Sequence, residues 1–209
     1  MRRPNIAPPE LQSNHFEFNE KNLEKAKSII AKYPKGKQAS AVIPLLDLAQ
    51  RQHNNWLPTV AMDYVADLLD MPAIKVYEVA SFYTMFNRKP VGKHFIQVCR
   101  TTSCWLRGSD ELVKTCERKL NIKPGEMTPD GKFSLVEVEC LGACVNAPMV
   151  QINDDYYEDL DVKNFEHLLG ELASAQKVTI GSQTGREASC PIDGPTTLKK
   201  YAKKTKGDI

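Results

Sequence analysis

From the 209-residue sequence we expect neither a membrane-spanning segment nor an export signal. No apolar run approaches the roughly 18 residues that suggest a spanning helix. Arg2 and Arg3 are followed by no apolar stretch, and the N-terminus has too few serines and too much proline for an amphipathic transit helix. We therefore expect no direct insertion into a membrane, and we expect the six cysteines to be reduced or bound to metal.

A strong net charge is also missing. The chain has 28 basic and 26 acidic side chains, a net charge of +2, which gives no electrostatic reason to expect nucleic acid as a partner. Two local runs stand out: Asp154, Asp155, Glu158, Asp159 and Asp161, and then Lys199, Lys200, Lys203, Lys204 and Lys206. Both are typical of solvated surface, and the alternative is contact with other subunits of complementary charge.

Several chemical motifs are absent. The sequence contains no C-x-x-C, so a thioredoxin-type redox disulfide is not expected. It contains neither G-x-G-x-x-G nor a P-loop, so nothing indicates a nucleotide or flavin site. An electron carrier without such a site needs an electron donor on another chain.

Four of the cysteines form two close pairs, Cys99 with Cys104 in CRTTSC and Cys140 with Cys144 in CLGAC. Four thiolates suit an iron–sulfur cluster or zinc. A [2Fe–2S] cluster takes two thiolates on each iron, which matches two pairs. Structural zinc sites usually have tighter spacings than those found here, so we predict a [2Fe–2S] cluster and keep structural zinc as the alternative.

The residues around these pairs suit a negatively charged cluster. Small residues in Leu141-Gly142-Ala143 allow backbone N–H groups to approach sulfur, and Gly142 can adopt a positive φ without steric cost. Arg100 and Arg107 flank the first pair, and we expect them to raise the reduction potential.

The remaining cysteines and histidines show no ligand pattern. Cys116 lies on the apolar face of a predicted helix and is expected in the protein core. Cys190 is expected to be a packed or free thiol. The histidines are His15, His53, His94 and His167. Only His94 is worth testing as a ligand, because it is the first residue of the strand that leads to Cys99.

Residues 1–18 are rich in Pro and Asn and are expected to form an arm that lies on another surface or is disordered. Residues 19–90 predict a bundle of four short helices. The expected starts are Asn19 and Ser40 as caps, Thr59, and Pro72 at a first helical position. Phe82, Tyr83 and Phe86 recur at helical spacing and are expected in its core, with a partner surface as the alternative.

Residues 91–180 change to an α/β pattern. Strands are expected at 94–99, 133–139, 149–152 and 156–160, with helices capped by Ser109 and Asp161. This β-α-β-β-α order is typical of a thioredoxin-like domain. Both cysteine pairs follow strands, so if these strands are parallel neighbours, the four sulfurs meet at one edge of the sheet.

The predicted fold class is therefore α+β, a helical bundle followed by a thioredoxin-like domain that carries the cluster. Residues 181–209 are expected to form an extended C-terminal tail. Pro191, Pro195 and the terminal lysines suggest a segment that wraps other subunits, and a flexible solvated tail is the alternative.

Four segments resemble the thioredoxin-like [2Fe–2S] subunits of respiratory NADH:quinone oxidoreductase, complex I. They are CRTTSCWLRG at 99–108, VECLGACVNAPMVQIND at 138–154, YYEDL at 156–160 and VYEVASFYTMF at 76–86. The resemblance covers about residues 19–175. One departure is Ser103, where relatives often have proline, and this concerns the rigidity of the loop.

The resemblance implies that Cys99, Cys104, Cys140 and Cys144 are the cluster ligands. It implies an electron-transfer subunit that docks on a flavin- and NADH-binding subunit, so that FMN and NADH are bound by the partner, with the large iron–sulfur subunit as a further partner. It also implies a peripheral position on the cytoplasmic face of the bacterial inner membrane, or on the matrix side in mitochondria.

Three other functions compete with this one. The equivalent subunit of a soluble NAD-linked hydrogenase or formate dehydrogenase would have a similar cluster domain. A structural zinc module would transfer no electrons. A diffusible ferredoxin is the third, and it would not need the helical bundle.

Overall fold

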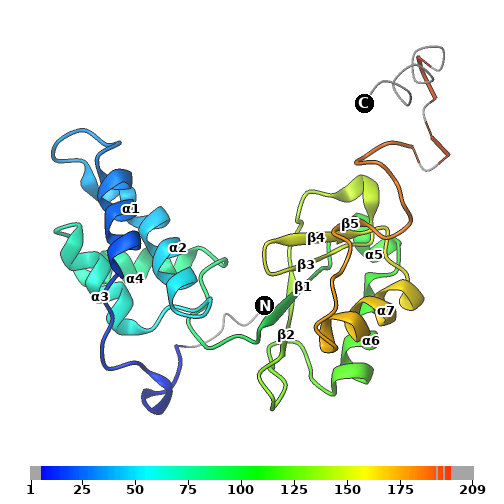
Figure 1. The fold of residues 1–209 in the computed structure, drawn as a ribbon, viewed down its shortest axis with the longest axis horizontal. Helices are drawn as coiled ribbons and strands as arrows, with labels where there is room; N and C mark the ends of the chain where they lie inside the picture. Colours follow the sequence, from blue (N-terminus) through cyan, green and yellow to red (C-terminus); the bar gives the residue numbers. More distant parts are fainter. Residues whose placement is uncertain (1–5, 192, 195, 199–209) are drawn as a thin grey trace. The chain divides into compact units, whose positions relative to one another are not determined.

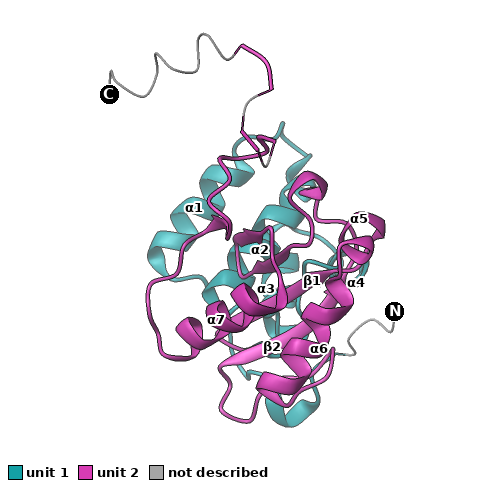
Figure 2. Cartoon of the chain, turned by 90° about the vertical axis from the view of Figure 1, so that its right-hand side faces the viewer, with its two compact units in different colours: residues 1–91 teal, residues 92–209 magenta. Residues whose placement is uncertain are grey.

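The structure is a computed structural model that describes residues 6–191, 193–194 and 196–198. The chain divides into two compact units, residues 1–91 and 92–209, which are coloured separately in Figure 2. Pro195 and the lysines of residues 199–206 lie outside the described residues, so the expectations for them are not addressed. In the described part of the chain, no helix is long and apolar enough to cross a membrane.

The first unit is helical. Its helices are α1 (Glu20–Ile30), α2 (Val42–Gln52), α3 (Thr59–Leu68) and α4 (Ala73–Phe82), with 3-10 turns at Pro9–Leu11 and Gln38–Ala41 (Figure 1). The predicted cap Asn19 is confirmed, because its side chain accepts a hydrogen bond from the Asn22 N–H at 2.9 Å. The predicted start of α3 at Thr59 is confirmed as well.

The predicted starts of the two other helices are each displaced. Ser40 does not cap α2, because it lies inside the preceding 3-10 turn and the helix begins at Val42. Pro72 occupies the N-cap of α4 instead of its first helical position. A serine or proline indicates a helix start to within a residue or two, and the neighbouring turn decides the register.

Residues 6–18 pack onto the helices of this unit. Phe16 and Phe18 are buried in its core, and both rings meet Tyr64 edge-on, with centroids 5.7 and 5.4 Å away. The Ala7 N–H donates to the Arg88 carbonyl at 2.8 Å. The described part of the expected N-terminal arm is therefore integral to the helical unit.

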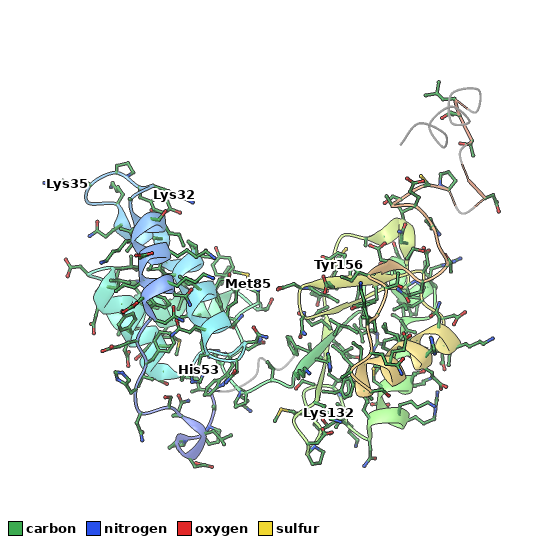
Figure 3. All side chains as sticks on the ribbon, in the orientation of Figure 1. Lys32, Lys35, His53, Met85, Lys132 and Tyr156 are labelled. Carbon is green, nitrogen blue, oxygen red and sulfur yellow. The ribbon has the colours of Figure 1, made fainter. Side chains whose placement is uncertain are left out.

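The expectation that Phe82, Tyr83 and Phe86, at the end of α4 and just after it, are core residues is wrong for two of the three. Phe86 is 3% exposed, but Phe82 is 65% and Tyr83 40% exposed. Their rings pack against each other at 5.1 Å, and the neighbouring Met85, labelled in Figure 3, is exposed too. The helical period does not extend past Phe82, because α4 ends there.

The second unit is built around a five-stranded sheet (Figure 1). Its strands are β1 (His94–Cys99), β2 (Phe133–Val138), β3 (Val150–Ile152), β4 (Asp155–Glu158) and β5 (Gly181–Ser182), in the order β2-β1-β3-β4-β5. Its helices are α5 (Thr102–Leu106), α6 (Ser109–Leu120) and α7 (Val162–Ala173), with a 3-10 turn at Cys144–Asn146. β1 is parallel to β2 and antiparallel to β3.

Alternation along the strands creates the core of this unit. Ile96 and Val98 of β1 are fully buried, and they belong to one apolar cluster with Leu112 and Cys116 of α6 and Phe165 of α7. Helices α6 and α7 lie beside each other against the sheet (Figure 1). The expectation that Cys116 is a core residue is therefore confirmed.

The two predicted helix caps of this unit have different outcomes. Asp161 caps α7 in a reciprocal capping box with Asn164, with hydrogen bonds of 2.7 and 2.8 Å. Ser109 is the first residue of α6 and not its cap, since Gly108 occupies that position with φ 97°. The short helix α5 and the strand β5 were not predicted.

Candidate metal centre

The topology brings the two cysteine pairs to one edge of the sheet. Cys99 is the last residue of β1 and lies opposite Val138, the last residue of the parallel strand β2. Cys140 follows two residues later, and Cys144 begins the 3-10 turn. Because the carboxyl ends of parallel strands share an edge, the predicted convergence of the two loops is confirmed.

The two pairs differ in burial. Cys99 and Cys104 are each 2% exposed and pack with Ala147 and Met149 in a small apolar cluster. Cys140 and Cys144 face solvent. A site with this arrangement has an inner side held by β1 and α5 and an outer side held by a loop.

The outer sulfurs are spaced as two ligands of one metal. Cys140 Sγ and Cys144 Sγ lie 3.7 Å apart. A tetrahedral metal with metal–sulfur bonds of about 2.3 Å separates two ligating sulfurs by about 3.8 Å. In the described part of the chain, no group of three or more His, Cys, Asp or Glu side chains is arranged to hold a single ion. Two pairs of thiolates with this spacing suit a cluster of two metals, each held by one pair.

Backbone and hydroxyl donors surround the sulfurs. The Leu141 N–H donates to the sulfur of Cys99. The Gly142 N–H donates to the sulfur of Cys140, and the Met149 N–H donates to that of Cys104. Gly142 has φ 88°, as its position in the loop predicts.

Thr101 adds a hydroxyl, 3.3 Å from Cys99 Sγ. The donors Thr101 and Met149 were missed by the sequence analysis, although Thr101 follows a ligand candidate by two residues. The loop that carries Leu141 is tied to β4, because the Tyr156 hydroxyl donates to the Leu141 carbonyl at 2.7 Å.

These surroundings change the acidity of the thiols. Burial raises the pKa of Cys99, but hydrogen bonds from the Thr101 side chain and backbone and from the Leu141 N–H outweigh it, so the net pKa is lowered. The Gly142 N–H and the Cys144 thiol lower the pKa of Cys140. Burial raises the pKa of Cys104 to about 12. A metal that binds here must displace the protons of the thiols that it ligates.

The two flanking arginines have different surroundings. Arg100 pairs with Asp110 at 2.6 Å and with Glu137, so its positive charge is already offset by two carboxylates. Arg107 donates from Nε to the Ala147 carbonyl at 3.4 Å. The expected influence on the reduction potential is therefore better assigned to Arg107 than to Arg100.

His94 lies at the far end of the strand from the cysteines. It opens β1 and Cys99 closes it, a separation of about 16 Å along an extended strand. Its ring packs near that of Phe133, at 5.1 Å. His94 is thereby removed from the candidate ligands.

Most of the acidic run has internal partners. Asp159 is buried and pairs with Arg186 at 2.7 Å, Glu158 accepts from the Asn146 amide at 2.7 Å, and Asp161 caps α7. Asp159 and Glu158 are therefore not solvated surface, whereas Asp161 is exposed and acts as the predicted helix cap. The contacts of Asp159 and Glu158 were not predicted, because they join residues far apart in the chain.

The comparisons with known proteins identify the family. The model of the family "Thioredoxin-like [2Fe-2S] ferredoxin" matches residues 26–173. The chain belongs to this family of thioredoxin-like [2Fe–2S] ferredoxins. Its cofactor is accordingly a [2Fe–2S] cluster, as the paired spacing predicts.

Curated relatives of this ferredoxin confirm the resemblance to complex I subunits. A subunit of the NADH-quinone oxidoreductase of Rickettsia bellii is 62% identical over 158 residues, which cover 76% of this chain and 95% of the relative. NADH dehydrogenase [ubiquinone] flavoprotein 2, mitochondrial, of Dictyostelium discoideum is 55% identical over 183 residues, 88% of this chain and 74% of the relative.

A solved structure shares the fold of this ferredoxin. An NAD+-reducing [NiFe]-hydrogenase in the H2-reduced state superposes with a TM-score of 0.57 at 22% identity. The match covers 64% of this chain and only 23% of the hydrogenase chain. At this identity the likeness concerns the fold alone.

Proposed function

We propose that this chain is the electron-transfer subunit of the NADH-oxidising module of complex I and that Cys99, Cys104, Cys140 and Cys144 hold its cluster. The placement of both cysteine pairs at the carboxyl ends of β1 and β2 carries the assignment of the ligands. The relatives at 55–62% identity support the assignment to NADH:quinone oxidoreductase.

The chain's own residues determine what such a cluster can do. A bound [2Fe–2S] cluster supplies the capacity to accept and release one electron at a time. The buried pair Cys99 and Cys104 keeps water from its inner side. N–H groups of Leu141, Gly142 and Met149 offset negative charge on the sulfurs.

The partner that exchanges electrons is a flavin- and NADH-binding subunit, and FMN and NADH belong to it. Three exposed apolar side chains support docking at the cluster edge: Trp105 and Leu106 follow Cys104, and Val145 follows Cys144. Exposed apolar groups beside a redox centre suit a partner interface. The large iron–sulfur subunit is the second proposed partner, and the proposed position is peripheral, on the cytoplasmic or matrix face of the membrane.

A soluble NAD-linked hydrogenase or formate dehydrogenase remains the second candidate assembly. The shared fold of the hydrogenase chain favours it, although at 22% identity. Co-purification separates the two. Membrane subunits that co-purify with the native protein support complex I, and a soluble complex with a hydrogenase or formate-oxidising chain refutes it.

Metal analysis tests the cluster and its ligands. We expect about two irons and two acid-labile sulfides in the anaerobically purified chain, with a rhombic EPR signal after reduction by dithionite. Cys140→Ser should abolish or alter this signal, and the control Cys190→Ser should not, because the hydrogen bonds of Cys190 are made by its backbone. About one zinc with no EPR signal would replace the proposed function by a structural one.

A further inference from the structure

The segment that follows α7 returns to the cluster domain and lies outside the part of the chain that the family model matches. Strand β5 pairs with β4 in parallel, with Gly181 opposite Tyr157 and Ser182 opposite Glu158. The Gln183 N–H then donates to the Glu158 carbonyl at 2.9 Å. We call residues 181–190 the strap.

A buried ion pair fixes the strap to the end of β4. Arg186 Nη2 lies 2.7 Å from Asp159 Oδ1, and the two side chains are 9% and 5% exposed. The Ser182 hydroxyl donates to the other carboxylate oxygen of Asp159 at 2.6 Å and accepts from the Arg186 N–H at 3.2 Å. Both oxygens of Asp159 are therefore engaged by the strap.

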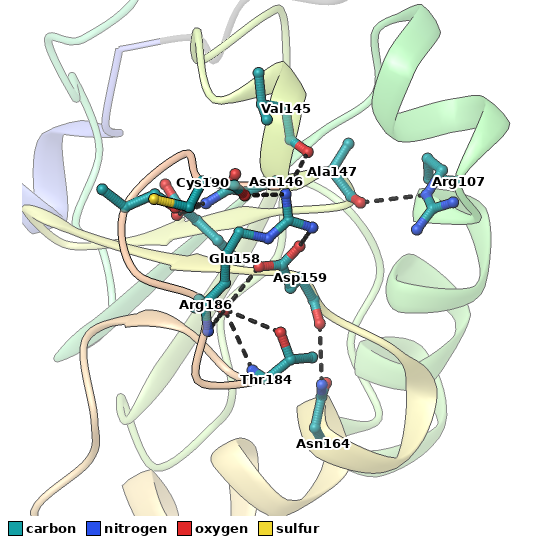
Figure 4. Close-up of polar contacts among 12 residues, drawn as sticks. Arg107, Val145, Asn146, Ala147, Glu158, Asp159, Asn164, Thr184, Arg186 and Cys190 are labelled. Carbon is teal, nitrogen blue, oxygen red and sulfur yellow. Dashed lines mark hydrogen bonds and ion pairs between the residues drawn. The ribbon is translucent and has the colours of Figure 1, made fainter. Parts of the chain in front are cut away.

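The strap also holds the turn that begins at Cys144. Figure 4 shows the Arg186 guanidinium between this turn and the strap, where Nη1 donates to the carbonyls of Val145 at 3.4 Å and Cys190 at 3.3 Å. The Asn146 amide donates to the Ala188 carbonyl at 2.9 Å. Two consecutive residues after Cys144 are thus hydrogen-bonded to the strap.

The turn needs such support more than the other ligand positions do. Cys99 is held by its pairing with β2 and Cys104 by a helix, whereas Cys144 is exposed and begins a three-residue 3-10 turn. Besides the strap contacts, the turn is tied to the sheet around Asn146. The Asn146 carbonyl accepts from the Asp159 N–H at 2.8 Å, and its amide also donates to Glu158.

The contacts among Arg186, Asp159 and Asn146 do not serve stability alone. In the described part of the chain, Arg186 Nε and Asn146 Oδ1 are buried without a hydrogen-bond partner. A buried ion pair often contributes less to the free energy of folding than apolar side chains of the same size would, and a fixed geometry is one benefit that can outweigh this. The guanidinium fork suits this task because it can hold a carboxylate and two carbonyls at once.

We propose that Arg186 is a positioning residue for the cluster site: through the strap it fixes the turn of Cys144, and so the geometry of the outer pair of thiolates. The inference rests on the proposed role of Cys144 as a ligand. It concerns a segment that the sequence analysis treated as a tail.

The test compares Arg186→Gln with Arg118→Gln in the full-length chain. Arg118 is the control for the loss of an arginine–carboxylate pair in the same unit: it pairs with Glu166 at 2.5 Å, but at the surface, with 56% of its side chain exposed against 9% for Arg186. It lies in the last turn of α6, about 14 Å along the helix from Ser109.

Hydrogen exchange of the Asn146 and Ala147 amides in the metal-free chain reports the turn directly. We expect at least about tenfold faster exchange of both amides in Arg186→Gln and no change in Arg118→Gln. Arg186→Lys should be intermediate, because an ammonium can pair with Asp159 but cannot span both carbonyls. Equal exchange in the two glutamine variants overturns the proposal.

In the cluster-loaded chain, Arg186→Gln should alter the EPR line shape and release iron several-fold faster than Arg118→Gln. Should Arg186→Gln not fold, Ser182→Ala removes only the hydroxyl that joins Asp159 and the strap, and faster exchange of the same amides is again required. A wild-type chain without a cluster signal refutes the proposed function, whereas the amide exchange decides the role of the strap independently.

Discussion

Cys99 and Val138 lie opposite each other as the last residues of two parallel strands, β1 and β2. This register decides where the site forms. The loop after β1 carries Cys104, and the loop after β2 carries Cys140 and Cys144, so both leave the sheet at one edge. The sulfur donors therefore converge without any long excursion of the chain, and the neighbouring residues can be tested individually.

Gly142 is the first residue to test, because its N–H hydrogen-bonds Cys140. With φ 88°, alanine at this position costs about 1 kcal/mol of backbone strain, although an added Cβ meets nothing within 4 Å. Gly125→Ala is a matched control, since Gly125 has φ 94° and equally open surroundings. We expect both variants to lose similar stability in urea unfolding of the metal-free chain.

Only Gly142→Ala should also lower the midpoint potential of the cluster, because a displaced N–H offsets less negative charge on sulfur. Potentiometric titration followed by EPR measures this. A Gly142→Ala potential equal to that of Gly125→Ala would show that the Gly142 N–H does not tune the cluster.

Arg107 should raise the midpoint potential. Its charge lies beside the ligand loops, and its Nε donates to the Ala147 carbonyl. Arg107→Ala should lower the potential, because reduction adds an electron to a cluster that is already negative. Arg107→Lys retains the charge and should recover most of the difference, while a lysine variant that behaves like alanine would assign the effect to the hydrogen bond.

Local patterns predicted much of this fold. The bounds of β1 at His94–Cys99, the Asn19 cap and the Asp161 cap depend on residues within one turn or strand, and all three predictions are confirmed. The convergence of the cysteine pairs was predictable because strand ends define the loops.

The failures involve tertiary contacts. The pair of Asp159 with Arg186 joins residues 27 positions apart, and nothing in either local sequence indicates it. The exposure of Tyr83 depends on where α4 ends, because Tyr83 follows the helix in extended backbone. Of the donors around the cysteines, Met149 directly precedes β3, which the sheet brings to the site and which spacing alone does not reveal.

Asn19 and Ser40 provide a direct test of the helix starts. Asn19→Ala should destabilise the chain by about 1 kcal/mol, since its side chain satisfies the Asn22 N–H. Ser40→Ala should change stability by less than about 0.5 kcal/mol, because Ser40 makes no cap bond to α2. Thermal or urea unfolding measures both changes in stability. An equal loss of stability in the two variants would show that Ser40 acts as a helix cap.

Cys116 makes the stability of the chain depend on alkaline pH. Burial raises its pKa from 9.0 to about 12, so the folded chain keeps this proton while the unfolded chain loses it above pH 9. An acid whose pKa is raised on folding stabilises the protein below its unfolded pKa, and this contribution is lost as the pH rises. Between pH 8 and 10 the loss should be about 1.4 kcal/mol.

Cys116→Ala isolates this contribution from the other groups that titrate in the same range. The free energy of unfolding of the metal-free chain should fall more steeply with pH in the wild type than in Cys116→Ala, by about 1.4 kcal/mol over that window. The alanine variant starts from a lower stability at pH 8, because it leaves a small cavity next to Leu112 and Phe165. Parallel curves from pH 8 to 10 would mean that the Cys116 thiol ionises equally well in the folded and unfolded chain, which its complete burial against α7 and the sheet argues against.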